Sequence, residues 1–238
     1  MARFQESTFW AIKAHRINSM NKDQTLTLPS EIEIPFRVVR PGDAPALQRL
    51  HARCSERTIY LRFLGPMKKL SDEQARYFAS TDGVDHFGLV ALDPQDPNEI
   101  IAVVRYARKP GNEPAEYAAL VEDGWQGRGV GAALTHRLID EARSNGVGSF
   151  YALVKGGNKR MLSVLRHLDL PERERVEDGE RMVEIGLSSE DPQTRARSAS
   201  CSGGRPTPST GYADAAGAAS QSRRTHLPRT HVEDVQRG

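Results

Sequence analysis

The sequence has two cysteines and almost no excess charge, and each scarcity excludes a class of protein. Cys54 and Cys201 form no Cys-x-x-Cys pair and have no histidine at metal-ligand spacing, which excludes a disulfide framework and a zinc site. Lys and Arg number 33 and Asp and Glu 31, a formal charge of +2, without the long basic run that nucleic-acid binding requires. The sequence therefore predicts no metal and no nucleic-acid partner.

Long hydrophobic runs are absent as well. No stretch approaches the ~20 consecutive apolar residues of a membrane-spanning helix. The first 20 residues also lack the apolar centre of a secretory signal. We therefore expect a cytoplasmic protein with no membrane partner.

The chain is polar for its length, and its polar residues gather at the two ends. Of 238 residues 38% are hydrophobic, and the mean hydropathy is −0.56. Residues 188–238 are rich in Ser, Gly, Ala, Arg and Pro and nearly devoid of Ile, Leu, Val and Phe, a composition too polar to form a core. Residues 1–35 show no sustained hydrophobic period. We predict a flexible lead-in over 1–35, one folded domain over 36–187 and a disordered tail over 188–238.

The middle of the chain alternates between the hydrophobic periods of strands and helices. Apolar runs bounded by turn residues predict strands at 36–40, 87–92, 100–107, 115–122, 150–154 and 182–187. Helical spacing predicts helices at 43–54, 71–80, 132–143 and 158–168. The fold class is therefore a mixed α/β (α+β) domain.

A glycine-rich loop lies between the strand at 115–122 and the helix at 132–143. Glycines let the backbone approach a ligand closely, and the first N–H groups of a helix have no partners within the helix, so such a loop binds phosphate. Gly131 is followed by Ala132 and Ala133, which excludes a Walker A motif because that motif needs Gly-Lys-Ser or Gly-Lys-Thr. A Rossmann loop would open the first βαβ unit, whereas several strands and helices precede this one.

The loop Gln126-Gly127-Arg128-Gly129-Val130-Gly131 resembles the Gln/Arg-x-x-Gly-x-Gly/Ala signature of GNAT acetyltransferases, which holds the pyrophosphate of acetyl-CoA. The resemblance implies the GNAT fold, a central, mostly antiparallel twisted sheet of six to seven strands flanked by about four helices. It also implies acetyl-CoA as co-substrate, with no metal. The implied cofactor-binding residues are Leu120 and Val121 through a backbone N–H, Asn158 on the following helix, and Gln126, Gly127, Arg128, Gly129, Val130, Gly131 and Ala132.

A second segment indicates which branch of the family the chain resembles. Residues 55–63, SERTIYLRF, resemble the Ser-x-x-Ser/Thr-x-Tyr-x-Arg-Phe element of bacterial Pat-like protein-lysine acetyltransferases. This resemblance implies that the amine acceptor is a protein lysine and that the segment forms a wall on the substrate side of the cleft.

Acyl transfer to a lysine needs a general base, because an amine with a pKa of ~10.4 is mostly protonated at neutral pH. Glu116 matches the position of the catalytic glutamate in Pat-like enzymes, and strand alternation places it on one face with Ala118. Glu113 and Glu122 are alternatives that rank below Glu116, since the first lies in a turn and the second would oppose the pyrophosphate.

Two departures from the family pattern leave other functions open. Residues 163–170 contain no tyrosine to protonate the departing thiolate, and Leu168-Asp169-Leu170 replaces the usual Gly-Phe pair. One alternative is a small-molecule or antibiotic N-acetyltransferase, for which Asp82, Asp85 and Glu113 could supply an acidic pocket. The other is a non-catalytic acyl-CoA-binding sensor.

Overall fold

The computed structural model describes residues 24–109, 114–177 and 180–187. The predicted tail at 188–238, residues 1–23 of the predicted lead-in, and Glu113 lie outside the described residues.

The described residues form one eight-stranded sheet in the order β1-β2-β3-β4-β5-β6-β8-β7. All neighbouring strands are antiparallel except β5 and β6, which are parallel. Their bounds are β1 Gln24–Thr27, β2 Glu33–Val38, β3 His86–Leu92, β4 Ile100–Ala107, β5 Ala115–Val121, β6 Ser149–Lys155, β7 Glu172–Glu177 and β8 Glu180–Gly186.

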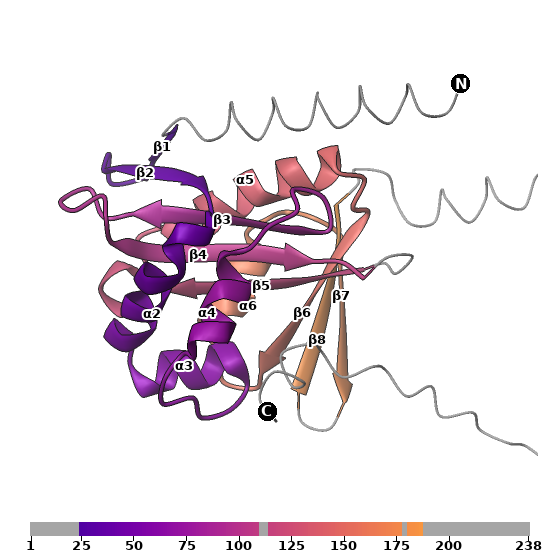
Figure 1. Cartoon of the computed structure of the whole chain (residues 1–238). Helices are drawn as coiled ribbons and strands as arrows, with labels where there is room; N and C mark the ends of the chain where they lie inside the picture. Colours follow the sequence, from indigo (N-terminus) through magenta and orange to yellow (C-terminus); the bar gives the residue numbers. More distant parts are fainter. Residues whose placement is uncertain (1–23, 110–113, 178–179, 188–238) are drawn as a thin grey trace, which may run out of the picture. The chain divides into compact units, whose positions relative to one another are not determined.

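Within the described ranges, five α-helices cover the two faces of this sheet. Helices α2, α3 and α4 lie in front of β3–β5 in Figure 1, and α5 lies behind them. The bounds are α2 Ala44–Arg53, α3 Glu56–Phe63, α4 Asp72–Ala79, α5 Val130–Ser144 and α6 Lys159–Arg166, with 3₁₀ turns η1 at Pro41–Asp43 and η2 at Asp123–Trp125. The predicted mixed, mostly antiparallel fold is confirmed, with eight strands instead of six to seven and five helices instead of about four.

Two strands account for the difference in strand count. Strand β1 lies within the predicted flexible lead-in, so residues 24–35 of that prediction are corrected: they form β1, its turn and the start of β2. Strand β7 has the sequence ERERVE, which lacks an apolar face. Pairing with β8 and ion pairs such as Arg181–Glu174, 2.7 Å, hold it in place, and neither can be recognised from hydrophobic period.

The helix starts follow from local sequence. Ser71 Oγ accepts a hydrogen bond from Gln74 N at 3.1 Å, and Gln74 Oε1 accepts one from Ser71 N at 3.0 Å, so α4 begins with a capping box. Ser55 is the N-cap of α3. These caps fix where the two helices of the α3–α4 layer begin.

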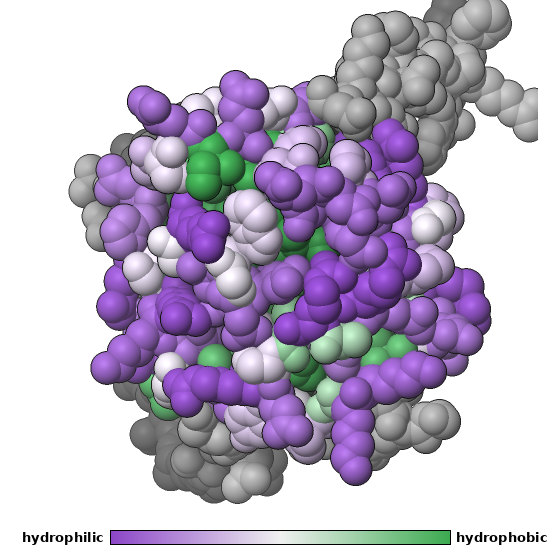
Figure 2. Space-filling view, turned by 90° about the vertical axis from the view of Figure 1, so that its left-hand side faces the viewer, coloured by the Kyte–Doolittle hydropathy of each residue, from purple (hydrophilic) through white to green (hydrophobic). Residues whose placement is uncertain are grey.

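The core lies mainly between α5 and the sheet. Its centre is a row of aromatic rings in which Tyr106 packs against Phe87 and Phe150, and Phe150 stacks on Tyr117 at 5.7 Å between ring centroids. On the side of the molecule shown in Figure 2, hydrophilic residues cover most of the surface and hydrophobic ones show in small separate areas. Most of the large apolar side chains are therefore buried in the core of the domain.

A buried hydrogen-bond chain ties β5 to α5. Thr135 Oγ1 donates its one hydrogen to Gly131 O at 2.6 Å. It must therefore accept the hydrogen bond that Tyr117 Oη makes with it at 2.7 Å. Burial raises the pKa of Tyr117 to about 12, although the Thr135 hydrogen bond opposes the shift, so the phenol keeps its proton at neutral pH. The strand and the helix that follow each other around the glycine loop are thus held at a fixed spacing.

Thr135→Val should lower the free energy of unfolding by about 1–3 kcal/mol, because it leaves the buried Tyr117 hydroxyl without an acceptor. In the double variant Tyr117→Phe/Thr135→Val the unpaired hydroxyl is gone, and most of the loss should be recovered. Urea unfolding of the single and double variants measures both values. Equal losses in the two variants would contradict this account of the contact.

Candidate active site

The parallel pair β5 and β6 stays together over a short distance. The register pairs Ala115 with Phe150 and Glu116 with Tyr151, and β6 then turns away from β5 (Figure 1). Glu116 therefore lies at the apex of a splay between the two strands. Among the described residues, the remainder of β5 has no strand paired with it on this side.

Strand alternation decides which backbone N–H groups of β5 face the splay. Glu122 N donates to Ile101 O at 2.9 Å, which places the N–H of Glu122 on the β4 side. Because successive residues of an antiparallel strand direct their N–H groups to opposite sides, Leu120 also faces β4, while Ala119 and Val121 face the splay. Leu120 and Val121 were both expected to offer a backbone donor, and the β4–β5 hydrogen-bond pattern directs only the N–H of Val121 toward the splay. The side chain of Leu120 lines a cavity on the sheet face covered by α2–α4.

The glycine loop has the backbone geometry of an anion site. Gly127 and Gly129 have φ of 75° and 92°, values that favour glycine. Gly129 is the N-cap of α5, and the first hydrogen bond of the helix runs from Ala133 N to Gly129 O at 2.9 Å. The N–H groups of Val130, Gly131 and Ala132 precede this bond and are available to an anion at the helix N-terminus.

The side chains of the loop have separate tasks. Val130 is fully buried, so its contribution to a ligand is its backbone. Arg128 is exposed, with its guanidinium carbon 5.1 Å from the Trp125 ring centroid. A Cβ on Gly131 would lie 3.3 Å from Val121 Cγ2, which explains why the smallest residue is found where the helix starts against β5.

The Gln126 side chain is engaged within the protein. Its Nε2 donates to Val121 O at 2.8 Å and to Thr58 Oγ1 at 3.2 Å, and Arg160 of α6 donates to its Oε1. Gln126 thereby joins β5, α3 and α6 around the splay.

Asp123 ties α3 to the same loop. Its carboxylate accepts hydrogen bonds from Ser55 N at 2.7 Å, Ser55 Oγ at 2.8 Å and Thr58 Oγ1 at 2.8 Å. Desolvation opposes ionisation of Asp123, but these hydrogen bonds outweigh it and lower its pKa. Sequence reasoning assigned Ser55 and Thr58 to a substrate-side wall and missed Asp123, because nothing in the sequence shows that η2 meets α3.

Glu116 is half-buried and lies among cationic and aromatic side chains. Its negative charge acts to raise the pKa of Arg62 of α3, Arg105 of β4 and Tyr151 of β6. Burial lowers the pKa of Arg62 to about 10, and the carboxylate of Glu116 opposes this shift. Sequence reasoning missed Arg105, although a single charge within the apolar run of β4 was a usable signal.

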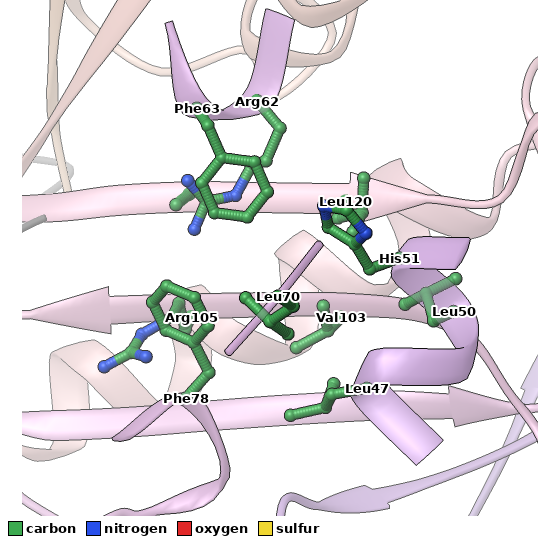
Figure 3. A pocket seen from close by; sticks show the side chains of 11 residues that line it. Leu47, Leu50, His51, Arg62, Phe63, Leu70, Phe78, Val103, Arg105 and Leu120 are labelled. Carbon is green, nitrogen blue, oxygen red and sulfur yellow. The ribbon is translucent and has the colours of Figure 1, made fainter. Parts of the chain in front are cut away.

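A cavity of about 30 Å³ lies between β4–β5 and the helices α2–α4 (Figure 3). Its lining is largely apolar and includes Leu47, Phe63, Phe78, Ala118 and Leu120. His51 and Arg105 also line it, and His51 Nε2 and Arg105 Nη1 are buried without a hydrogen-bond partner. Two buried polar atoms without a hydrogen-bond partner therefore lie at this cavity.

Asn158 caps the helix on the far side of the splay. Its Oδ1 accepts a hydrogen bond from Met161 N at 3.1 Å, and α6 begins at the next residue. Asn158 is thus the N-cap of α6, and its contact with the pantetheine arm stays a prediction.

The other carboxylates considered earlier have structural partners. Asp82 Oδ1 accepts hydrogen bonds from the backbone of Val84, Asp85 and His86 at 2.8–2.9 Å, and Asp85 pairs with Arg108 at 2.8 Å. Glu122 pairs with Arg53 at 3.1 Å. Each of these three carboxylates therefore has a structural role that requires no bound substrate.

Within the described ranges, no three His, Cys, Asp or Glu side chains gather as a metal site would require. Nor does any helix of the described residues have the length and apolarity needed to cross a membrane.

Comparison with known proteins agrees with this geometry. The family model described as "Acetyltransferase (GNAT) family" matches residues 48–169. The acetyltransferase PA5475 of Pseudomonas aeruginosa is 30% identical over 127 residues, covering 53% of this chain and 68% of that protein. The acetyltransferase Pat of Mycolicibacterium smegmatis is 34% identical over 138 residues, covering 56% of this chain; the match spans 40% of the length of Pat.

Among solved structures, the GNAT domain of S. lividans PAT is similar to this chain, with a TM-score of 0.63 and 31% identity. The match covers 69% of this chain and 96% of that domain. The matched family model spans the splay, the glycine loop and α6. The chain therefore belongs to the GNAT family of acetyltransferases, which are acyltransferases with acetyl-CoA as co-substrate.

Proposed function

We propose that the protein transfers an acetyl group from acetyl-CoA to the amine of a protein lysine, by direct attack in a ternary complex with Glu116 as general base. The observation that carries the proposal is the position of Glu116 at the apex of the splay. There the carboxylate lies between the open edge of β5 and the face covered by α3.

The glycine loop fits the pyrophosphate of acetyl-CoA. The N-terminus of α5 offers backbone N–H groups and the positive end of the helix dipole, and both favour a phosphate group. In this proposal Asn158, at the start of α6, contacts the pantetheine arm from the other side of the splay. Arg128 adds a cation at the exposed end of the loop.

The reaction needs one proton acceptor and one carbonyl-polarising donor. Glu116, directly or through a water, takes a proton from the lysine ammonium, and the neutral amine attacks the thioester carbonyl carbon. The N–H of Val121, directed into the splay, hydrogen-bonds the carbonyl oxygen as negative charge develops on it. The nitrogen of the tetrahedral intermediate then loses its extra proton to solvent, the carbon–sulfur bond breaks, and CoA leaves as a thiolate that takes up a proton from solvent.

A protein lysine is favoured as acceptor by the segment 55–63 and by similarity to Pat. The segment forms α3, and hydrogen bonds from Ser55 and Thr58 to Asp123 fix it beside the loop that holds the donor. The acidic pocket expected for an antibiotic acceptor gains no support, because Asp82 and Asp85 are engaged in a turn and an ion pair.

Glu116→Gln should lower kcat roughly 10²- to 10⁴-fold, the range typical of general-base catalysis. The Kd for acetyl-CoA should stay unchanged, because the side chain lies away from the glycine loop. Thiol release against lysine-bearing proteins and small amines gives the first value, and calorimetry gives the second.

Glu122→Gln is the matched control, because Glu122 is the competing carboxylate beside the loop and should retain activity. A larger loss in Glu122→Gln than in Glu116→Gln would reassign the base. Acetyl-CoA binding without turnover on any acceptor would favour the acyl-CoA-binding sensor.

Gly129→Ala should weaken acetyl-CoA binding roughly tenfold, since a left-handed residue with a Cβ is strained by about 1–2 kcal/mol and the loop relaxes away from its binding geometry. The new Cβ would also lie 3.3 Å from Pro29 Cδ. Gly124→Ala is the control, because its Cβ meets nothing within 4 Å. Calorimetric titration with acetyl-CoA compares the two, and equal affinities would exclude this loop as the pyrophosphate site.

A further inference from the structure

Two arginines converge on the face of the sheet that carries Glu116. Arg62 is in the last turn of α3, and Arg105 projects from β4 opposite Ala118. Their guanidinium carbons lie 5.8 Å and 5.1 Å from the centroid of the same ring, Phe78. In the view of Figure 3 both guanidinium groups point to the same end of the cavity, and His51 lies at the other end.

Neither guanidinium has an ion-pair partner in the part of the chain that the structure describes. Arg105 is 8% exposed, and its Nη1 has no hydrogen-bond partner. A side-chain hydrogen bond joins its guanidinium to Tyr77, and the guanidinium carbon lies 4.8 Å from the centroid of the Tyr77 ring. Aromatic faces compensate a desolvated cation in part, but an unpaired buried charge normally demands an anion.

Both groups stay cationic at neutral pH. Burial lowers the pKa of Arg62 to about 10, and the neighbouring charge of Arg105 lowers it further while Glu116 acts in the opposite direction. Burial also lowers the pKa of Arg105, opposed by Tyr77 and Glu116. The charge of Glu116 thus acts on both arginines, no ion pair joins it to either among the described residues, and the three groups together carry an excess positive charge.

We propose that Arg62 and Arg105 form a carboxylate-binding subsite beside Glu116, which selects a substrate that carries an acidic group close to the reacting centre. The planar donor fork of a guanidinium matches a carboxylate and gives it two parallel hydrogen bonds. The adjoining cavity of about 30 Å³ has room for a small group. This inference rests on the proposed acyl transfer at Glu116 and names a substrate class for that site.

A carboxylate can reach this subsite from either substrate. The donor can carry it at the end of a dicarboxylic acyl chain, because an acyl group in the splay points toward its apex. The acceptor can carry it next to the amine, because the amine must approach Glu116 from the same face. Both sources place the same chemistry between the same two arginines, and separate measurements distinguish them.

The donor arm compares succinyl-CoA with butyryl-CoA, a neutral thioester of the same carbon number, by calorimetric Kd. The acceptor arm compares two lysine peptides that differ by one residue, Glu or Gln next to the lysine, by Kd in the presence of CoA and by kcat/KM with acetyl-CoA. We expect the acidic member of one pair to be preferred. In Arg105→Met and in Arg62→Met that preference should fall roughly tenfold or more.

Arg76→Met is the control, because Arg76 is an exposed arginine of the neighbouring helix α4 and should leave the preference intact. Arg105→Lys should keep part of it, since the charge remains and the fork is lost. Thermal unfolding of each variant separates a folding defect from a loss of selectivity.

Three results would overturn the carboxylate subsite. The first is no preference for the acidic member of either pair in the unmodified protein. The second is a preference that survives both arginine substitutions. The third is an equal loss for acidic and neutral substrates together with a move of the acid limb of the kcat/KM profile to higher pH, which would show that the arginines serve Glu116 alone.

The calorimetric arms also separate this inference from the proposed function. If no acceptor is acetylated but succinyl-CoA still binds in an Arg105-dependent manner, the acetyltransferase proposal fails and the subsite stands. If Glu116-dependent acetyl transfer is observed without selectivity for acidic groups, the subsite fails and the acetyltransferase proposal stands.

Discussion

The short parallel pairing of β5 with β6 is the constraint on which the site depends. Two residue pairs hold the strands together at Glu116 and Tyr151, and beyond them the inner edge of β5 has no strand beside it. Buried backbone N–H and C=O groups need partners, so the edge from Ala119 to Val121 must bond water, side chains or a ligand. Gln126 takes the carbonyl of Val121. The N–H groups are left for the pantetheine arm and thioester of the proposed donor.

Hydrogen bonds around the splay connect the sides that are proposed to bind the acyl donor and the acceptor. Asp123 holds the N-terminus of α3, while Gln126 joins β5 to α3 and receives a hydrogen bond from Arg160 of α6. The glycine loop, which is proposed to bind the pyrophosphate, is therefore tied directly to α3, which is proposed to form the wall on the acceptor side. Positioning of this kind is what a direct transfer between two bound substrates requires, since the amine and the carbonyl must meet within a fraction of an ångström.

The face proposed to receive the acceptor combines an apolar cavity with buried positive charge. Most of its lining is aliphatic or aromatic, and yet Arg105 and His51 keep buried nitrogen atoms without partners there. Such groups lower stability unless something else satisfies them. Their presence beside Glu116 fits a site that exchanges some folding stability for substrate recognition.

The sequence by itself determined the fold class and the glycine loop, because these depend on local hydrophobic period and on glycine at fixed spacing, while Glu116 was chosen by resemblance to Pat-like enzymes and stays a prediction. The sequence did not reveal β1 or β7, whose few apolar residues carry no period. Only the tertiary structure placed Arg62, Arg105 and Asp123 around the same strand and turned Val121, rather than Leu120, toward the splay. Contacts between segments far apart in sequence, and the pairing register of β4 with β5, decide these features, and neither is encoded in any local pattern.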